Sequence, residues 1–301
     1  MGCEAANRSP GCAEFDRLEN LYGWLIEDRA DLGDGVWVGR GARSVTVFSD
    51  EQQVAINDLV DSSWWYQVRN SLLIRYLHRY GLSGAMWDVG SGTGIVSQAL
   101  RDSGFQVVAL EPAVGGAVSA AARGLPSVAS TLEDLRLPAR SISAIGLFDV
   151  IEHLGEPEAL IAECCRVLAP SGQLYVTVPA HAWLWSQADT LAQHQRRYTR
   201  QALRTLLENS GFEIQDCSYR LASLVAPLAV VRSIPWRLGY RPESTVFQKQ
   251  LGYSSTLLTR CLTGLESLVG GTSPIGTSLF ACAAPRSAAT SDATDGVCWN
   301  G

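Results

Sequence analysis

Short apolar runs alternate along this chain with longer segments in which apolar residues recur every three or four positions. The apolar runs, which we interpret as strands, lie at 85–87, 106–110, 128–131, 142–148, 173–179, 212–217 and 277–283. Helical spacing marks residues 50–80, 95–101, 159–168 and 199–209. Strands that alternate with helices build βαβ units and a mostly parallel sheet. The pattern therefore predicts an α/β domain over most of the chain.

A glycine loop follows the first of these strands directly. Asp88 precedes Gly90, Ser91, Gly92 and Gly94, and the segment behind the loop has helical spacing. Glycines at alternate positions let the backbone turn sharply and approach a ligand that any Cβ would exclude. A strand, a glycine loop and a helix in that order indicate a nucleotide-like ligand.

The spacing of the loop distinguishes between ligands. A dinucleotide site has the spacing G-x-G-x-x-G, whereas this chain has G-x-G-x-G behind an acid. A carboxylate at the mouth of the loop repels a pyrophosphate but attracts a ligand that carries an ammonium and a sulfonium group. The glycine spacing and Asp88 therefore disfavour a nicotinamide oxidoreductase.

Together with the blocks that follow it, the loop resembles motif I of the class I S-adenosylmethionine-dependent methyltransferases. The resemblance covers about residues 64–216, with a weaker echo to 285. It implies a Rossmann-like, doubly wound, seven-stranded sheet, mostly parallel with an antiparallel final strand at one edge. It also implies S-adenosylmethionine as the cofactor, bound by Asp88 and the loop residues. Glu111 ends the second strand at about the separation from the loop at which an acid reaches ribose hydroxyls.

Further acids extend the expected cofactor site. After the third strand, Thr131 stands where the family usually has an aspartate. Glu133 or Asp134 could take over the hydrogen bond to the adenine amino group. The same two acids could instead begin a solvated helix, and the sequence leaves both possibilities open.

A second group of polar residues would form the acceptor side of the site. Asp149-x-x-Glu152-His153 follows the fourth strand, where related methyltransferases have a similar sequence beside the transferred methyl group. A histidine is the natural general base for a hydroxyl nucleophile near neutral pH. We expect His194 or His153 to fill that role, with Asp149 at the cofactor. The residues expected to contact the acceptor are Trp65, Tyr66, Glu152, Arg197 and Tyr198.

Two alternatives apply to these polar residues. Asp149, Glu152, His153 and His181 could together bind a divalent cation. Carboxylates and histidines are more often hydrogen-bonded without a metal, so we expect none. Arg197 could clamp an anionic acceptor, or it could cap and solvate the next helix.

Composition and charge argue against other classes of protein. With 47% hydrophobic and 18% charged residues over 301 positions, the chain is expected to be soluble and globular. Its net charge of −6 and pI near 5.3 argue against a nucleic-acid partner, which usually leaves a basic footprint. The eight cysteines form no C-x-x-C pair, and no secretory signal is evident. We therefore expect reduced thiols and a cytoplasmic location.

The regions outside the predicted sheet divide into three parts. Residues 1–50 lack sustained periodicity and are interpreted as an N-terminal appendage to a methyltransferase domain over 51–285. Within that domain, 221–272 form an enlarged insertion between strands 6 and 7, and its apolar stretch is too short to span a bilayer. The insertion is expected to cover the substrate, to form a homodimer or to make a peripheral membrane contact. Residues 286–301 are expected to be a disordered tail.

Two functions remain open. The first is an S-adenosylmethionine-dependent methyltransferase that acts on a small-molecule acceptor, with an oxygen as the favoured target. The second is a non-catalytic S-adenosylmethionine-binding subunit or regulator. The glycine loop and Glu111 support cofactor binding under both, whereas only the groups around His153 and His194 favour turnover.

Overall fold

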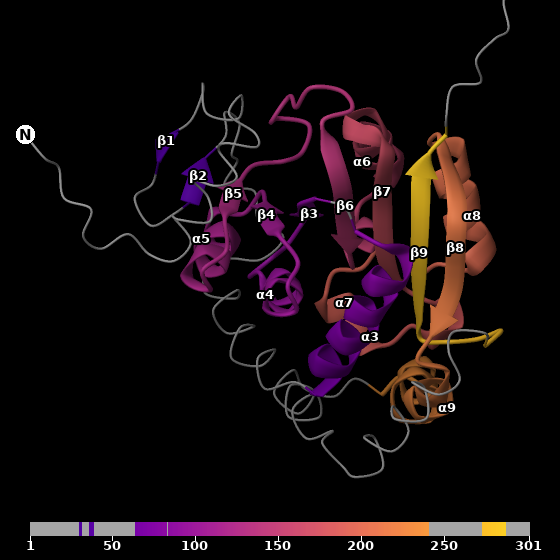
Figure 1. Cartoon of the computed structure of the whole chain (residues 1–301). Coiled ribbons are helices and arrows are strands. Elements are labelled where there is room, and N and C mark those ends of the chain that lie inside the picture. The colour runs from indigo at the N-terminus through magenta and orange to yellow at the C-terminus, as the bar shows by residue number, and fades with distance from the viewer. Residues whose placement is uncertain (1–29, 32–35, 39–63, 83, 241–272, 287–301) are drawn as a thin grey trace, which may run out of the picture.

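The computed structural model describes residues 30–31, 36–38, 64–82, 84–240 and 273–286 (Figure 1). These residues form one nine-stranded sheet with helices packed against it. The strands are β1 (Ala30–Asp31), β2 (Val36–Val38), β3 (Met86–Val89), β4 (Val107–Glu111), β5 (Ser127–Ala129), β6 (Ile142–Phe148), β7 (Leu168–Pro179), β8 (Phe212–Arg220) and β9 (Ser278–Pro285). Their order across the sheet is β1-β2-β5-β4-β3-β6-β7-β9-β8. The α/β class predicted from the sequence is confirmed.

The centre of the sheet is parallel and one side is antiparallel. Strands β5, β4, β3, β6 and β7 pair in parallel, which requires crossover connections between them. β9 runs antiparallel to both β7 and β8 and lies between them. The final strand is antiparallel, as expected. The expectation that it forms the edge is wrong, because the chain returns after β8 into the position beside β7 and leaves β8 outermost.

Helices accompany almost every strand. They are α3 (Trp64–Tyr80), α4 (Ile95–Asp102), α5 (Val114–Ala122), α6 (Pro157–Val167), α7 (Gln187–Leu191), α8 (Arg200–Asn209), α9 (Val225–Leu228) and α10 (Ile234–Arg237), with the π-helical turn η5 (Ala229–Ser233) between the last two. The predicted helices at 95–101, 159–168 and 199–209 correspond to α4, α6 and α8. Of the predicted helix at 50–80, residues 64–80 form α3 and the rest lies outside the described residues. None of the helices in the described parts of the chain is long and apolar enough to cross a membrane.

Two short strands extend the sheet beyond the seven that were predicted. β2 pairs in parallel with β5, and β1 pairs antiparallel with β2. Both belong to the predicted appendage, where strands of three and two residues are too short to show a periodic pattern. Val36 of β2 packs with Ala117 of α5 and Ala129 of β5. The predicted count of seven strands is therefore too low by two, and the remainder of residues 1–50 lies outside the described residues.

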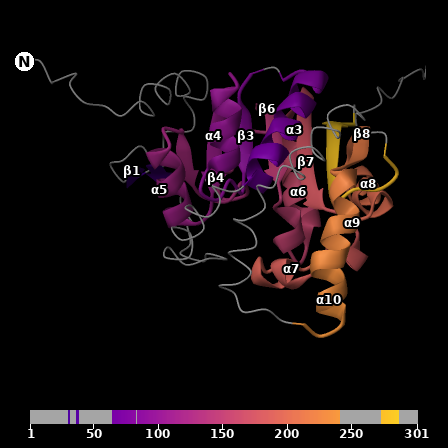
Figure 2. The ribbon, with the colours of Figure 1, turned by 90° about the horizontal axis from the view of Figure 1, so that it is seen from below.

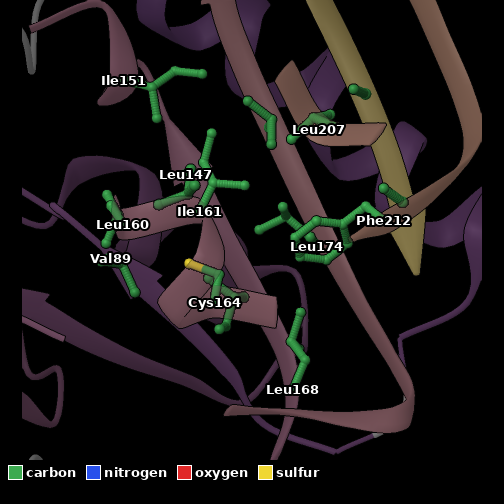
Figure 3. Close-up of a cluster of buried hydrophobic side chains, with 14 of the residues drawn as sticks. Val89, Leu147, Ile151, Leu160, Ile161, Cys164, Leu168, Leu174, Leu207 and Phe212 are labelled. Carbon is green, nitrogen blue, oxygen red and sulfur yellow. The ribbon is translucent and has the colours of Figure 1, made fainter. Parts of the chain in front are cut away.

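Alternate strand residues divide the core into two layers. Leu147 and Leu174 pack with α6 and α8, in the cluster that Figure 3 shows. Met86 and Tyr175 point the opposite way and pack with residues of α3 and α4. Because both faces are covered, the loops at the carboxyl ends of the parallel strands are where polar side chains can gather.

Gly94 and Gly92 offer a matched test of how the glycine loop is built. Both have a left-handed φ, 79° and 56°, so an alanine at either position is strained by about 1–2 kcal/mol. A Cβ at Gly94 would also come within 2.8 Å of Ala120 and Leu125, whereas a Cβ at Gly92 would meet nothing within 4 Å. We expect Gly94→Ala to lower the free energy of unfolding by about 1–3 kcal/mol more than Gly92→Ala does. Urea denaturation measures both, and equal losses would show that the packing at Gly94 relaxes freely.

Candidate active site

The glycine loop turns over the carboxyl end of β4. The backbone N–H groups of Gly90 and Ser91 donate to the carbonyl oxygen of Leu110, at 2.7 and 3.1 Å. Gly94 donates to the carbonyl oxygen of Ser91 at 3.0 Å, and α4 begins directly behind it. The loop is therefore anchored to the neighbouring strand before the helix starts.

Glu111, at the end of β4, fixes the middle of the same loop. Its Oε2 accepts a hydrogen bond from the N–H of Gly92 at 2.8 Å, and its Oε1 accepts one from the N–H of Ala113 at 3.0 Å. Burial raises the pKa of this carboxyl, and the two backbone bonds oppose that shift. The structure thus brings together the loop and the acid that the sequence singled out separately.

Asp88 lies beneath the glycine loop. Its side chain is 1% exposed and accepts a hydrogen bond from the Ser97 hydroxyl, in the first turn of α4. Burial raises the pKa of this carboxyl to about 6, while the Ser97 bond and the charge of Arg69 act in the opposite direction. Asp88 therefore holds α4 against β3, and its direct contact with a ligand's ammonium group stays a prediction.

The segment after β5 is a turn and not the start of a helix. The hydroxyl of Thr131 donates to the Asp134 carboxylate at 3.0 Å, and the N–H of Asp134 donates to the Thr131 hydroxyl at 3.1 Å. Glu133, between them, is exposed. Of the two acids considered for the adenine amino group, Asp134 is engaged within the turn, and Glu133 stays a prediction.

A buried ion pair that no sequence motif marks joins α3 to the ends of β6 and β7. Arg69 is 2% exposed, and its Nη2 lies 2.8 Å from Thr177 Oγ1 and 2.8 Å from Asp149 Oδ2. The Thr177 hydroxyl donates to Asp149 Oδ1 at 3.1 Å. Asp149 is therefore engaged by the protein itself. An arginine four residues before Leu73, on the apolar side of a helix, is the sequence signal that could have revealed this pair.

Glu152 and His153 lie in the 3-10 turn η2 (Ile151–His153) and do not begin a helix. Glu152 is 0% exposed, and neither carboxylate oxygen has a hydrogen-bond partner among the described residues. Burial and the nearby charge of Asp149 raise its pKa well above the ordinary value. Burial and the neighbouring His194 lower the pKa of His153.

His194 is held by a carboxylate that the sequence did not single out. Its Nδ1 lies 2.9 Å from Oδ1 of Asp189, which is 0% exposed. Asp189 also accepts from Nε and Nη2 of Arg197 at 2.6 and 3.0 Å, and from N and Oγ of Ser186 at 2.8 and 3.2 Å. Burial acts to raise the pKa of Asp189, but the bonds from His194, Arg197 and Ser186 outweigh it and lower the pKa to about 2. The spacing Ser186-x-x-Asp189, which forms a capping box on α7, is the signal that could have found it.

The ionised Asp189 also decides which nitrogen of His194 is available. An ionised carboxylate can only accept a hydrogen bond, so Nδ1 of His194 carries the proton that it donates to Asp189. In the neutral form of the ring, Nε2 then keeps its lone pair. The His194 ring lies edge to face with that of His153, with 4.9 Å between centroids. The two histidines considered as bases are therefore adjacent, and His194 is the one that the structure orients.

Arg197 and Tyr198 are occupied by framework contacts. Besides its two bonds to Asp189, Arg197 donates from Nη1 to the carbonyl oxygen of Ala180 at 3.0 Å. Tyr198 is 5% exposed, and its hydroxyl donates to the carbonyl oxygen of Ile151 at 3.2 Å. These contacts fix the position of Asp189 and of η2. A contact of either residue with the acceptor stays a prediction.

Two other predicted residues lie on α3, and one histidine lies apart. Tyr66 is partly buried, and burial raises the pKa of its hydroxyl while Arg69 opposes the shift. Trp65 belongs to α3, but its side chain lies outside the described part of the chain. His181 stacks on Tyr219, with 4.7 Å between ring centroids and 17° between planes.

Three donor groups could hold a divalent cation. Glu152, His153 and His194 each offer one ligand atom, and these atoms all lie within 4.8 Å of one another. The set differs from the one considered from the sequence, because α3 engages Asp149 and His194 joins the group. The absence of a metal stays a prediction.

Comparison with known proteins identifies relatives over the same region. A family model described as a methyltransferase domain matches residues 64–216. A probable S-adenosylmethionine-dependent methyltransferase of Mycolicibacterium smegmatis is 29% identical over 166 residues, which cover 54% of this chain and 64% of that protein. A ubiquinone biosynthesis O-methyltransferase of Xanthomonas oryzae pv. oryzae is 28% identical over 197 residues, or 58% of this chain and 78% of that protein. The chain thus spans less than two thirds of the first of these relatives.

A solved structure shows the same fold. The phosphoethanolamine N-methyltransferase 2 of Haemonchus contortus, in complex with S-adenosyl-L-methionine, aligns with a TM-score of 0.51 and 17% identity. The alignment covers 80% of this chain and 58% of that one. At this identity the likeness concerns the arrangement of helices and strands alone.

The buried carboxyl of Asp88 predicts a pH dependence of stability. Its folded pKa of about 6 lies above an unfolded value of about 4, so the folded state binds the proton more tightly. Stability is therefore lost as the pH rises from about 4 to about 6. We expect Asp88→Asn to exceed the wild type in unfolding free energy by about 3 kcal/mol at pH 8 and by little at pH 4. Urea denaturation of both proteins at the two pH values measures their unfolding free energies. A difference between them that does not change with pH would contradict the raised pKa of Asp88.

Proposed function

This chain belongs to the methyltransferase domain family, its cofactor is S-adenosylmethionine, and we propose that it transfers a methyl group to an oxygen of a small-molecule acceptor. The observation that carries the choice of oxygen is the pair of Asp189 and His194. A histidine whose Nδ1 is bound to an ionised carboxylate is suited to remove a hydroxyl proton through Nε2. That one relative is named an O-methyltransferase supports the same choice.

The glycine loop and Glu111 fit this cofactor. A Cβ at Gly92 would meet nothing within 4 Å, so the backbone is open to a ligand on that side. The Glu111 carboxylate, at the end of β4, is proposed to bind the ribose hydroxyls, and the exposed Glu133 is proposed to approach the adenine. S-adenosylmethionine supplies a methyl group that is already activated by its sulfonium. The protein's task is then to align the acceptor oxygen with that methyl group.

His194 is the proposed general base. As the acceptor oxygen bonds to the methyl carbon and the carbon–sulfur bond breaks, Nε2 of His194 takes the hydroxyl proton. Asp189 then faces an imidazolium ion, which its fixed negative charge stabilises. Because the pKa of Asp189 is lowered to about 2, its negative charge is present near neutral pH and stabilises the imidazolium there.

His153 and Glu152 are proposed to line the acceptor side. The lowered pKa of His153 keeps its ring neutral, so it does not repel the imidazolium that forms on His194. The buried carboxyl of Glu152 has no hydrogen-bond partner among the described residues, so it is proposed to bind a polar group of the acceptor. Tyr66, which reaches the same region from α3, is proposed as a further wall of the acceptor site.

A second candidate function keeps cofactor binding without turnover. Asp149 was expected at the cofactor, and Arg197 and Tyr198 at the acceptor, yet each makes hydrogen bonds or ion pairs within the protein. Such engagement is what a cofactor-binding subunit or regulator would show. The orientation of His194 by Asp189 is the feature that favours the transferase.

The described start of the insertion covers α3. Leu221 and Leu224 are buried and pack with Val68 and Leu72 of that helix. This packing supports a role of the insertion as a cover of the acceptor side. Residues 241–272 lie outside the described part of the chain, and the homodimer expected from the sequence stays a prediction.

Isothermal titration with S-adenosylmethionine, S-adenosylhomocysteine and NAD tests the cofactor site. We expect binding of the first two, and a loss of at least about tenfold in Gly92→Val, because its side chain would occupy the ligand's approach. Gly104→Val is the matched control, since Gly104 also has a left-handed φ, 93°, and open space around it. Tight NAD binding without a response to the sulfonium would overturn the cofactor assignment.

Methyl-label transfer from S-adenosylmethionine to small molecules of a cell extract tests the base. We expect His194→Ala to keep cofactor binding and to lower the transfer rate by about 10²–10⁴. Asp189→Asn should lower the rate as well, because an amide can present its N–H to Nδ1 and reverse the tautomer. His78→Ala is the control. It removes a ring that packs at a tilt against Phe105 near the carboxyl end of α3, and it should leave the rate unchanged.

Two results would contradict the proposed base. An unchanged rate of methyl transfer in His194→Ala would show that His194 is not the general base. A rate lost on chelation and restored by a divalent cation would assign Glu152, His153 and His194 to metal binding.

A further inference from the structure

The large apolar side chains exposed in the described residues are gathered in one part of the molecule. Seven of the eight, all except Val118 on α5, lie between η3 (Ala182–Leu184) and residue 240, just beyond the end of α10. We refer to these seven residues as the apolar face. They are Trp183, Leu191, Val230, Val231, Ile234, Leu238 and Tyr240.

The apolar face is built by two segments that pack together. The Ser233 hydroxyl of η5 donates to the carbonyl oxygen of Leu184 at 2.9 Å, which ties η5 to η3. Figure 2 shows α7 and α10 together at the end of the molecule away from α4 and α5. Val230, Ile234 and Leu238 recur every four residues and are 62%, 49% and 82% exposed, so they form one stripe along the helical run.

Such exposure is unusual for a surface that only meets water. Contiguous exposed apolar side chains mark sites where another apolar phase binds. Trp183 and Tyr240, which also belong to the apolar face, are residue types that favour the boundary between lipid and water. The apolar face therefore has the composition of an interfacial helix that lies on a membrane.

The charge of the same segments points to the occupant. The segments that carry the apolar face, residues 182–191 and 225–240, contain two arginines, Arg232 and Arg237, and one acid, in a chain whose net charge is −6. That acid is Asp189, which Arg197 neutralises in the interior. Arg237, between Ile234 and Leu238 in sequence, is exposed. An exposed arginine beside apolar residues, with the one acid of these segments neutralised in the interior, complements an anionic lipid surface.

A second copy of this chain is a poorer fit to the apolar face. A two-fold dimer brings the same surface of both copies together. Centred on α10, it would place the Arg237 side chains of the two copies near each other. The segment 217–240 offers no carboxylate to compensate them, so repulsion would oppose the contact.

We propose that the apolar face docks the protein on an anionic lipid bilayer, with the helical run from Val225 to Arg237 lying along the membrane surface. The proposal goes beyond methyl transfer, because docking requires no turnover. It has a consequence for the site, since α7 belongs to the same face and carries Asp189, the partner of His194. The acceptor side of the site then lies close to the lipid.

Co-sedimentation of the full chain with vesicles tests the docking. We expect binding to vesicles of phosphatidylglycerol and phosphatidylcholine, weaker binding to phosphatidylcholine alone, and a decrease with added salt. Leu238→Ser should weaken partition about tenfold, because a large side chain no longer enters the lipid. Val118→Ser, a comparable change on an exposed residue of α5, is the matched control and should leave partition unchanged.

Other outcomes would overturn the proposal. Absence of binding to both kinds of vesicle would show that the protein does not dock on lipid. Equal losses of binding in Leu238→Ser and Val118→Ser would show that the apolar face is not the surface that contacts the lipid. A concentration-dependent dimer in sedimentation equilibrium that Leu238→Ser dissociates would assign the face to a second copy. Titration with S-adenosylmethionine confirms that each variant is folded, so a failure of docking is distinguished from a failure of the proposed methyl transfer.

Discussion

The buried guanidinium of Arg69 is the interaction on which the arrangement of the site depends. It fastens α3 to the end of β7 through Thr177 and to the turn after β6 through Asp149. A buried charge needs partners, and Nη2 of Arg69 meets both residues at 2.8 Å, while its Nε has no hydrogen-bond partner among the described residues. Its positive charge also opposes the rise that burial causes in the pKa of Asp88. One cation thus links the helix, the ends of two strands and the acid beneath the glycine loop.

The buried carboxyls around that cation differ because their hydrogen-bond donors differ. Asp88 has one side-chain donor and a raised pKa, and Glu152 has no donor among the described residues and a raised pKa as well. Asp189 accepts bonds from a histidine, an arginine and a serine, and its pKa is lowered. Donors stabilise the ionised form against the cost of burial. The site therefore contains a carboxyl with a raised pKa beside His153 and a carboxylate with a lowered pKa behind His194.

The same contacts explain where sequence reasoning succeeded. The glycine loop and its flanking strand and helix occupy consecutive residues, and Glu111 follows at the end of the next strand, so local pattern was sufficient to place them. The interior position of β9 and the short strands β1 and β2 escaped prediction, because pairing partners are chosen by the assembled sheet. The roles of Arg197 and Tyr198 also escaped it, since residue type alone does not tell whether a polar group meets a ligand or the protein's own backbone.

By itself, the sequence determined the α/β class, the seven principal strands and the position of the cofactor loop, because each depends on periodicity or glycine spacing within a few residues. Only the tertiary structure decided which polar and charged side chains meet. Arg69 and Thr177 are 108 positions apart in the chain, and His194 approaches His153 from a different loop. The physical reason is that burial and hydrogen bonding, which set the charge state of Asp88, Glu152 and Asp189, are properties of the packed chain and of no local segment.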